Sequence, residues 1–200
     1  MHAKRAMLLA LCSAVLLPAA AGARGTAPGP RGGPGGGPRA GYFPNAVFDT
    51  HDGRKVRFYD DVVRGRVVVF NMMYTACTGI CPPNTANLMA VRNLLGARVG
   101  RDVHMVSLTL QPELDTPAAL LAYARQYGTG SGWTFLTGQR ADMEQVRRRL
   151  GFYDTDPAED GRLSRHTGMV VIGNERLDRW CMMPALTSAR QIAHAILNLT

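Results

Sequence analysis

Continuous apolar runs alternate with segments of helical periodicity from residue 43 onward. The runs at 66–74 (RVVVFNMMY) and 103–110 (VHMVSLTL) predict strands that are covered on both faces. Between them, apolar residues at three- and four-residue spacing predict an amphipathic helix over 84–95. Strands that alternate with helices predict an α/β domain with a partly parallel sheet.

Turn and capping residues bound the remaining predicted elements. Asp-Gly at 52–53 predicts a hairpin turn. Asp115-Thr116-Pro117 predicts a helix start, capped by one of its first two residues, and Gly128 predicts the helix end. The other predictions are a strand at 133–137, a basic helix at 142–150, a hairpin of 169–172 and 177–182 around Gly173-Asn174, and a last helix opened by the capping box at 188–191.

The first 41 residues follow a different pattern. Residues 1–23 combine a basic start, an apolar run and a small-residue site, which is typical of a secretory signal. An uncleaved membrane anchor is the alternative. Residues 24–41 are mostly Gly and Pro and predict a disordered linker. The domain is therefore expected to span 42–200 and to be exported, to the periplasm or another extracytoplasmic membrane face.

Charge narrows the choice of partners only slightly. The chain of 200 residues has a formal net charge of +8, but five cations and no acid lie in its first forty residues, which leaves +3 for the rest. No Lys/Arg cluster is interleaved with aromatic residues, so no nucleic-acid partner is predicted. Export would place paired cysteines where disulfides can form.

The most specific motif is Cys77-Thr-Gly-Ile-Cys81-Pro82-Pro83, between the 66–74 strand and the next helix. Ligands of open α/β sheets sit beyond the carboxyl ends of strands. The positive end of a helix lowers the pKa of nearby thiols. A thiolate pair suits a soft metal such as Cu(I) or zinc, an iron–sulfur cluster, or thiol–disulfide exchange. A structural disulfide is the alternative.

Two thiolates leave a metal under-coordinated, so a histidine is the expected third ligand. His51 is expected in an exposed turn, His104 half-buried in a strand, and His194 on the last helix. His166 lies in a polar loop that leads into the 169–172 strand. On the residues alone, His166 remains one candidate among these four.

Three other sulfur-bearing side chains are interpreted as core residues. Cys181 is expected to be buried like a small apolar residue, with a resolving thiol or an extra soft ligand as the alternative. Met72 and Met73 are expected to fill the core.

The order of these segments resembles the Sco/SenC family of thioredoxin-like copper proteins along residues 43–199. The resemblance is carried by YTACTGICP at 74–82, SLTLQPELDTP at 107–117, WTFLTG at 133–138 and His166-Thr. It implies a thioredoxin-like α/β fold with a central mixed sheet flanked by helices and a C-terminal β-hairpin.

The resemblance also implies the site and its role. Cys77, Cys81 and His166 would be the copper ligands, with Cys77 and Cys81 as a redox-active pair. The family commonly has an acidic residue where this chain has Arg165, and a cation there is expected to oppose a bound metal ion.

The implied function is that of a metallochaperone. It would carry Cu(I) or Cu(II) to the copper-centre subunit of cytochrome c oxidase, for assembly of the dinuclear centre. Other copper chaperones or thiol reductants would be further partners. The alternative is a thiol-disulfide oxidoreductase that acts on cysteines of an exported partner. A peroxidase has no signature of its own here, and a plain interaction module leaves the paired thiols unexplained.

Overall fold

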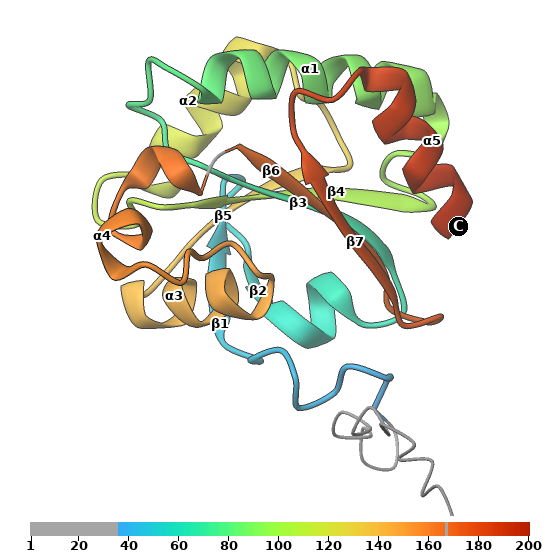
Figure 1. Cartoon of the computed structure of the whole chain (residues 1–200), viewed down its shortest axis with the longest axis horizontal. Coiled ribbons are helices and arrows are strands. Elements are labelled where there is room, and N and C mark those ends of the chain that lie inside the picture. Colours follow the sequence, from blue (N-terminus) through green and yellow to red (C-terminus); the bar gives the residue numbers. More distant parts are fainter. Residues whose placement is uncertain (1–35, 167) are drawn as a thin grey trace, which may run out of the picture.

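The computed structural model describes residues 36–166 and 168–200, in which a seven-stranded mixed sheet lies between two helical layers (Figure 1). The strands are β1 Val47–Thr50, β2 Lys55–Arg57, β3 Val67–Met73, β4 Val103–Thr109, β5 Trp133–Thr137, β6 Met169–Asn174 and β7 Arg179–Pro184. The α-helices are α1 Cys81–Leu95, α2 Pro117–Tyr127, α3 Arg140–Arg149, α4 Pro157–Asp160 and α5 Ala189–Leu199. A π-helix, Phe58–Val63, and two 3₁₀ turns, Gly96–Arg98 and Leu163–Arg165, complete the described elements.

The sheet has the order β2-β1-β5-β4-β3-β6-β7. β3, β4 and β5 run parallel, while β1 and β6 pair antiparallel with β5 and β3. β3 is thus a central strand, and six of its seven residues are buried, as its continuous apolar run predicts. Its carboxyl end is where the Cys77–Cys81 loop begins.

Two apolar cores fill the space on either side of the sheet. One core packs α1, α2 and α5 against the sheet, and it includes both Cys77 and Cys81. The other packs α3 and the 58–63 turn against the opposite face, around the rings of Phe48, Phe58 and Phe70. Figure 1 shows the first group of helices above the sheet and α3 below it. The expected α/β architecture with a terminal hairpin is confirmed.

Several predicted boundaries differ from the structure. α1 begins at Cys81, three residues before the predicted start, because Pro82 and Pro83 are accommodated in its first turn. The β6–β7 turn is not at Gly173-Asn174, which belong to β6; it lies at 175–178, where Asp178 adopts a φ of 50°. Thr116, rather than Asp115, caps α2 by accepting from the Ala119 N–H.

The described chain begins at the end of the sheet opposite the cysteine loop. In the β6–β7 turn, the Asp178 carboxylate accepts from the Arg39 guanidinium, and Glu175 Oε1 accepts from the Arg39 backbone N–H at 3.2 Å. Glu175 in turn bonds Arg66 O through its own N–H at 3.0 Å, beside the amino end of β3. Residues 36–41, which the sequence places in the linker, therefore contact the domain at this end.

The leader 1–23 and the linker up to residue 35 lie outside the described residues. Within 36–166 and 168–200, no helix combines the length and apolar character needed to cross a membrane.

Candidate metal centre

Cys77 and Cys81 lie together at the amino end of α1. Cys81 is the first residue of the helix, and its N–H donates to Cys77 Sγ at 3.3 Å. Pro82 and Pro83 carry no N–H, so Cys81 supplies one of the few amide donors at this helix end. Both thiols are buried and neither is in a disulfide. The structure therefore brings the two cysteines together at the helix end, as their spacing predicts.

Hydrogen bonds favour the thiolate form of Cys77. Burial on its own would raise the pKa of Cys77, but hydrogen bonds from the Cys81 thiol and N–H, the Tyr74 hydroxyl and the Gly79 backbone outweigh it and lower the pKa. The same hydrogen bond, together with burial, raises the pKa of Tyr74 to about 12. Tyr74 thus stays a proton donor while Cys77 loses its proton, which suits metal binding or thiol exchange.

Tyr74→Phe should raise the pKa of Cys77, because the variant removes one of the donors that stabilise the thiolate. The thiolate of the variant will therefore form at higher pH than that of the unmodified chain. The measurement is the pH midpoint of Cys77 alkylation, followed by peptide mass spectrometry. Tyr153→Phe is the matched control because Tyr153 is exposed beside Arg148. Equal midpoints in all three proteins would contradict the role of the Tyr74 hydroxyl.

The buried carboxylate of Asp115 anchors the start of the cysteine loop. It accepts from the Thr75 N–H at 3.2 Å and from the hydroxyls of Thr75 and Thr109. Asp115 therefore ties the chain between β3 and Cys77 to the carboxyl end of β4. The sequence predicts Asp115 or Thr116 as the cap of α2; because Thr116 is the cap, the Asp115 carboxylate is available for the cysteine loop.

The His166 ring packs against Arg147 of α3 and Asp160 of α4 in this structure. The ring is buried, its Nε2 lies 2.6 Å from the Asp160 carbonyl oxygen, and Arg147 Nη1 lies 3.2 Å from Nδ1 and 3.3 Å from Nε2. It lines a cavity of about 470 Å³ between α3 and the segment from Asp154 to His166. Among the described residues, no three His, Cys, Asp or Glu side chains are gathered closely enough to hold a metal ion.

The backbone near His166 nevertheless lies beside the cysteine loop. A Cβ built on Gly168 would be 3.8 Å from Ile80 Cδ1, and Ile80 directly precedes Cys81. Figure 1 shows α4 and the loop that leads into α1 at the same end of the molecule. The thiols and the backbone next to the imidazole thus share one end of the sheet, while the ring itself contacts Arg147 and Asp160.

The other histidines lie in different parts of the fold. His51 is half-buried, not exposed as expected, because its Nδ1 accepts from the Phe135 N–H at 3.2 Å. Burial lowers the pKa of His51 and of His104, which is half-buried in β4. His194 is exposed on α5. Arg165 points to the Glu159 carboxylate at 2.7 Å, so the cation beside the imidazole is Arg147 instead.

Cys181 is exposed, and the expectation of a buried thiol was wrong. It lies on the edge strand β7, which has a paired neighbour on one side only within the described sheet. Met72 and Met73 are buried in the core, as expected.

Three residues with a bearing on the site were not found from the sequence. They are Tyr74, Asp115 and Arg147. Tyr74 follows the central strand directly, which is a signal that could have been used. Arg147 lies three residues after Glu144 on a basic helix, but its contacts with Asp160 and His166 depend on tertiary packing.

The comparisons with known proteins agree with one another. The family model described as SCO1/SenC matches residues 42–200. A SCO1 protein homolog of Bacillus subtilis is 34% identical over 100 residues, which cover 49% of this chain and 50% of the relative. The match therefore spans about half the length of that relative.

Solved structures show the same fold at low sequence identity. The copper-bound ScoI of Bradyrhizobium japonicum superposes with a TM-score of 0.60 at 19% identity, covering 77% of this chain and 96% of that one. BsSco, a member of the Sco family of cytochrome c oxidase assembly proteins in which a disulfide switch was identified, gives a TM-score of 0.62 at 21% identity, covering 78% and 93%. These likenesses support a thioredoxin-like architecture of the Sco type.

Proposed function

This chain belongs to the SCO1/SenC family, and from that premise we propose that it binds copper through Cys77, Cys81 and His166 for assembly of the dinuclear copper centre of cytochrome c oxidase. The observation that carries the proposal is the pair of reduced, buried thiols at the amino end of α1. Soft thiolates prefer Cu(I), and an imidazole completes a three-ligand site for either copper valence.

The redox state of the thiols would control the metal. Oxidation to a Cys77–Cys81 disulfide removes two electrons and two protons from the thiols, and a partner disulfide that accepts them becomes two thiols. The disulfide leaves no thiolate at the site, so copper would be released. The disulfide switch of the relative BsSco supports this step.

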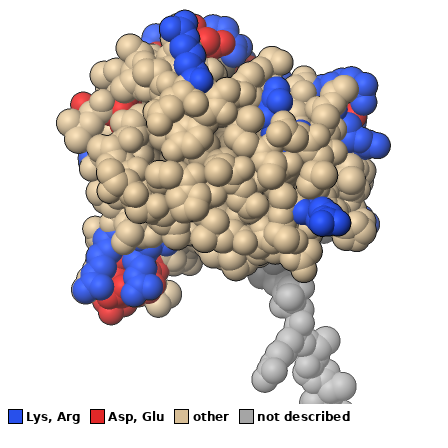
Figure 2. Space-filling view, turned by 90° about the horizontal axis from the view of Figure 1, so that it is seen from above, with Lys and Arg blue, Asp and Glu red and all other residues tan. Residues whose placement is uncertain are grey.

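The position of the site suits transfer to a protein partner. α1 contains a single charged residue, Arg92, and the face over α1 is mostly uncharged, with charged side chains at its edges (Figure 2). The described chain begins at the opposite end of the sheet, where Arg39 contacts the β6–β7 turn. In an exported chain that keeps its leader as an anchor, the thiols would therefore point away from the membrane. The proposed partner is the copper-centre subunit of the oxidase.

The second candidate is a thiol-disulfide oxidoreductase that acts on the cysteines of an exported partner. The lowered pKa of Cys77 favours it, because a thiolate is the attacking species in thiol–disulfide exchange. A role in reducing the partner's cysteines and a role in carrying copper use the same two thiols.

Anaerobic titration of the reduced full-length chain with Cu(I) against a chromophoric chelator should give one tightly bound copper per chain. The same chain after oxidation to the Cys77–Cys81 disulfide should compete poorly, because both thiolate ligands are gone. An insulin-reduction assay is run in parallel. Rapid insulin reduction together with weak copper binding by the reduced chain would overturn the carrier proposal in favour of the oxidoreductase.

A further inference from the structure

Two contacts hold the buried ring of His166. The Asp160 carbonyl oxygen, 2.6 Å from Nε2, can only accept, so Nε2 carries the proton and donates. Arg147 Nη1 lies 3.2 Å from Nδ1 and 3.3 Å from Nε2, so the guanidinium lies against the face of the ring and not in line with either nitrogen. Both hydrogens of Nη1 already have acceptors, the Phe152 carbonyl oxygen and Asp160 Oδ1. A metal ion held by the two thiols could use the imidazole only after the ring leaves these contacts.

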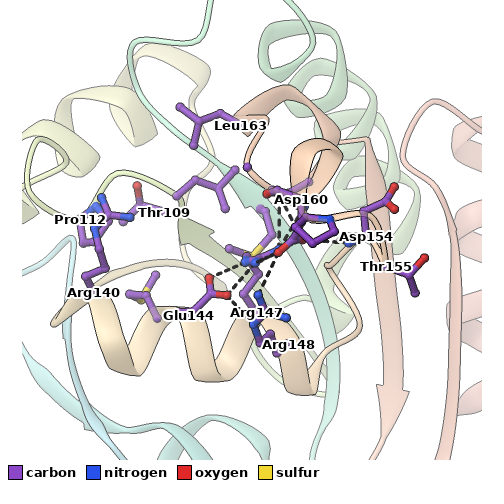
Figure 3. A pocket seen from close by; sticks show the side chains of 16 residues that line it. Thr109, Pro112, Arg140, Glu144, Arg147, Arg148, Asp154, Thr155, Asp160 and Leu163 are labelled. Carbon is purple, nitrogen blue, oxygen red and sulfur yellow. Dashed lines mark hydrogen bonds and ion pairs between the residues drawn. The ribbon is translucent and has the colours of Figure 1, made fainter.

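Arg147 is held firmly in the place where it meets the ring. Its side chain is only 7% exposed and pairs with Glu144 at 2.7 Å and Asp160 at 2.8 Å. It also donates to the Phe152 carbonyl oxygen. Figure 3 shows Arg147 and Arg148 of α3 lying between the carboxylates of Glu144 and Asp160. The guanidinium cannot leave His166 without breaking these charge-assisted hydrogen bonds.

The charges around the docked ring largely balance. Arg147 pairs with both Glu144 and Asp160, and the Asp160 carboxylate lies 3.7 Å from His166 Nε2. Position, not net charge, therefore opposes metal binding by the docked ring, because the same imidazole is needed beside the thiols.

We propose that Arg147 and the Asp160 carbonyl form a dock that holds His166 in the metal-free protein and competes with copper for the imidazole. The inference rests on the proposed function, in which His166 is the third ligand. Copper loading then requires the ring to leave the dock and turn toward Cys77 and Cys81, next to which the backbone at Gly168 already lies. Only molecules with an undocked ring can bind copper through all three ligands, so the apparent copper affinity is proportional to the undocked fraction. Arg147 is thus a positioning residue that sets how readily the site accepts metal.

Arg147→Gln should tighten copper binding by about tenfold and speed association, because it removes the guanidinium that packs against the ring in the docked state alone. Arg148→Gln is the matched control. Arg148 also bonds Glu144 at 2.6 Å and Asp160 at 3.0 Å, but its contacts do not include His166. It should leave copper affinity within about twofold. Both are measured by chelator competition and stopped-flow mixing on the reduced full-length chain.

A His166→Ala background separates docking from general loosening of the fold. In that background Arg147→Gln should no longer change copper affinity, since no ring remains to be released. An equal gain with and without His166 would overturn the dock, as would equal effects of the Arg147 and Arg148 variants. If His166→Ala binds copper as tightly as the unmodified chain, the ligand assignment of the proposed function fails instead.

A measurement on the unmodified chain covers the case in which Arg147→Gln does not fold. Nitrogen NMR of the His166 ring in the metal-free, reduced chain should show the tautomer protonated at Nε2, whose N–H donates to the Asp160 carbonyl oxygen. Titration with Cu(I) should shift one ring nitrogen to a metal-bound signal. A freely exchanging tautomer mixture in the metal-free chain would overturn the proposal.

Discussion

Replacing Cys77 or Cys81 by serine will lower the copper affinity of the reduced chain by roughly 300-fold. This figure gives each thiolate one quarter of the ~10–16 kcal/mol with which a four-ligand structural site binds zinc. A serine hydroxyl stays protonated at neutral pH and is a hard donor, so it replaces neither the charge nor the polarisability of a thiolate. The effect should be similar for the two cysteines, because both lie at the same end of α1. Chelator competition under anaerobic conditions measures it.

Cys181→Ser is the matched control for this experiment. Cys181, like the other two, is not in a disulfide, but it is exposed on β7 and does not lie at the amino end of α1. Its replacement should leave copper affinity unchanged. All variants carry Cys12→Ala, so that the leader thiol does not contribute. A Cys77→Ser chain that binds one copper as tightly as the Cys181→Ser chain would remove Cys77 from the site.

The fold was largely predictable because its signals are local. The apolar run that becomes β3, the Thr116-Pro117 start of α2 and the Ser188 cap of α5 each depend on a few neighbouring residues. The cysteine pair was predictable for the same reason. Its spacing and the prolines that follow it determine how the thiols meet the helix end.

The rest of the site depends on contacts between distant segments. Arg147 reaches Asp160 and His166 across the turn between α3 and α4, and no pattern within α3 indicates which partners it will have. Arg165 was expected to be the cation beside the ring because it is adjacent in sequence. Adjacent residues often point in different directions, and here Arg165 pairs with Glu159 at the surface.

Exposure was hardest to predict at the sheet edge. Cys181 lies in an apolar sequence with Met182 and Met183, which favours a buried strand. β7 is the last strand of the sheet, however, so cover from helices and neighbours is incomplete there. Whether a strand is central or at an edge follows from topology, which the strand's own residues do not encode.

Asp115→Ala should lower the free energy of unfolding by about 3 kcal/mol, because it leaves buried donors without an acceptor. The carboxylate is fully buried and takes hydrogen bonds from the Thr75 N–H and from the hydroxyls of Thr75 and Thr109. The hydroxyls can turn to other acceptors, but the Thr75 N–H is fixed by the backbone. Urea unfolding of the reduced, metal-free chain, followed by circular dichroism, measures the change.

The same substitution should weaken copper binding, and this links the carboxylate to the site. Without Asp115, the chain from Thr75 to Cys77 loses its tie to β4, so fewer molecules hold the two thiols ready for metal. Thr116→Ala is the matched control: it removes the α2 cap, worth about 1 kcal/mol, and leaves the loop anchor intact. The copper affinity of Asp115→Ala should therefore be about tenfold lower than that of Thr116→Ala. Equal losses of stability and affinity in the two variants would mean that Asp115 acts only at the start of α2.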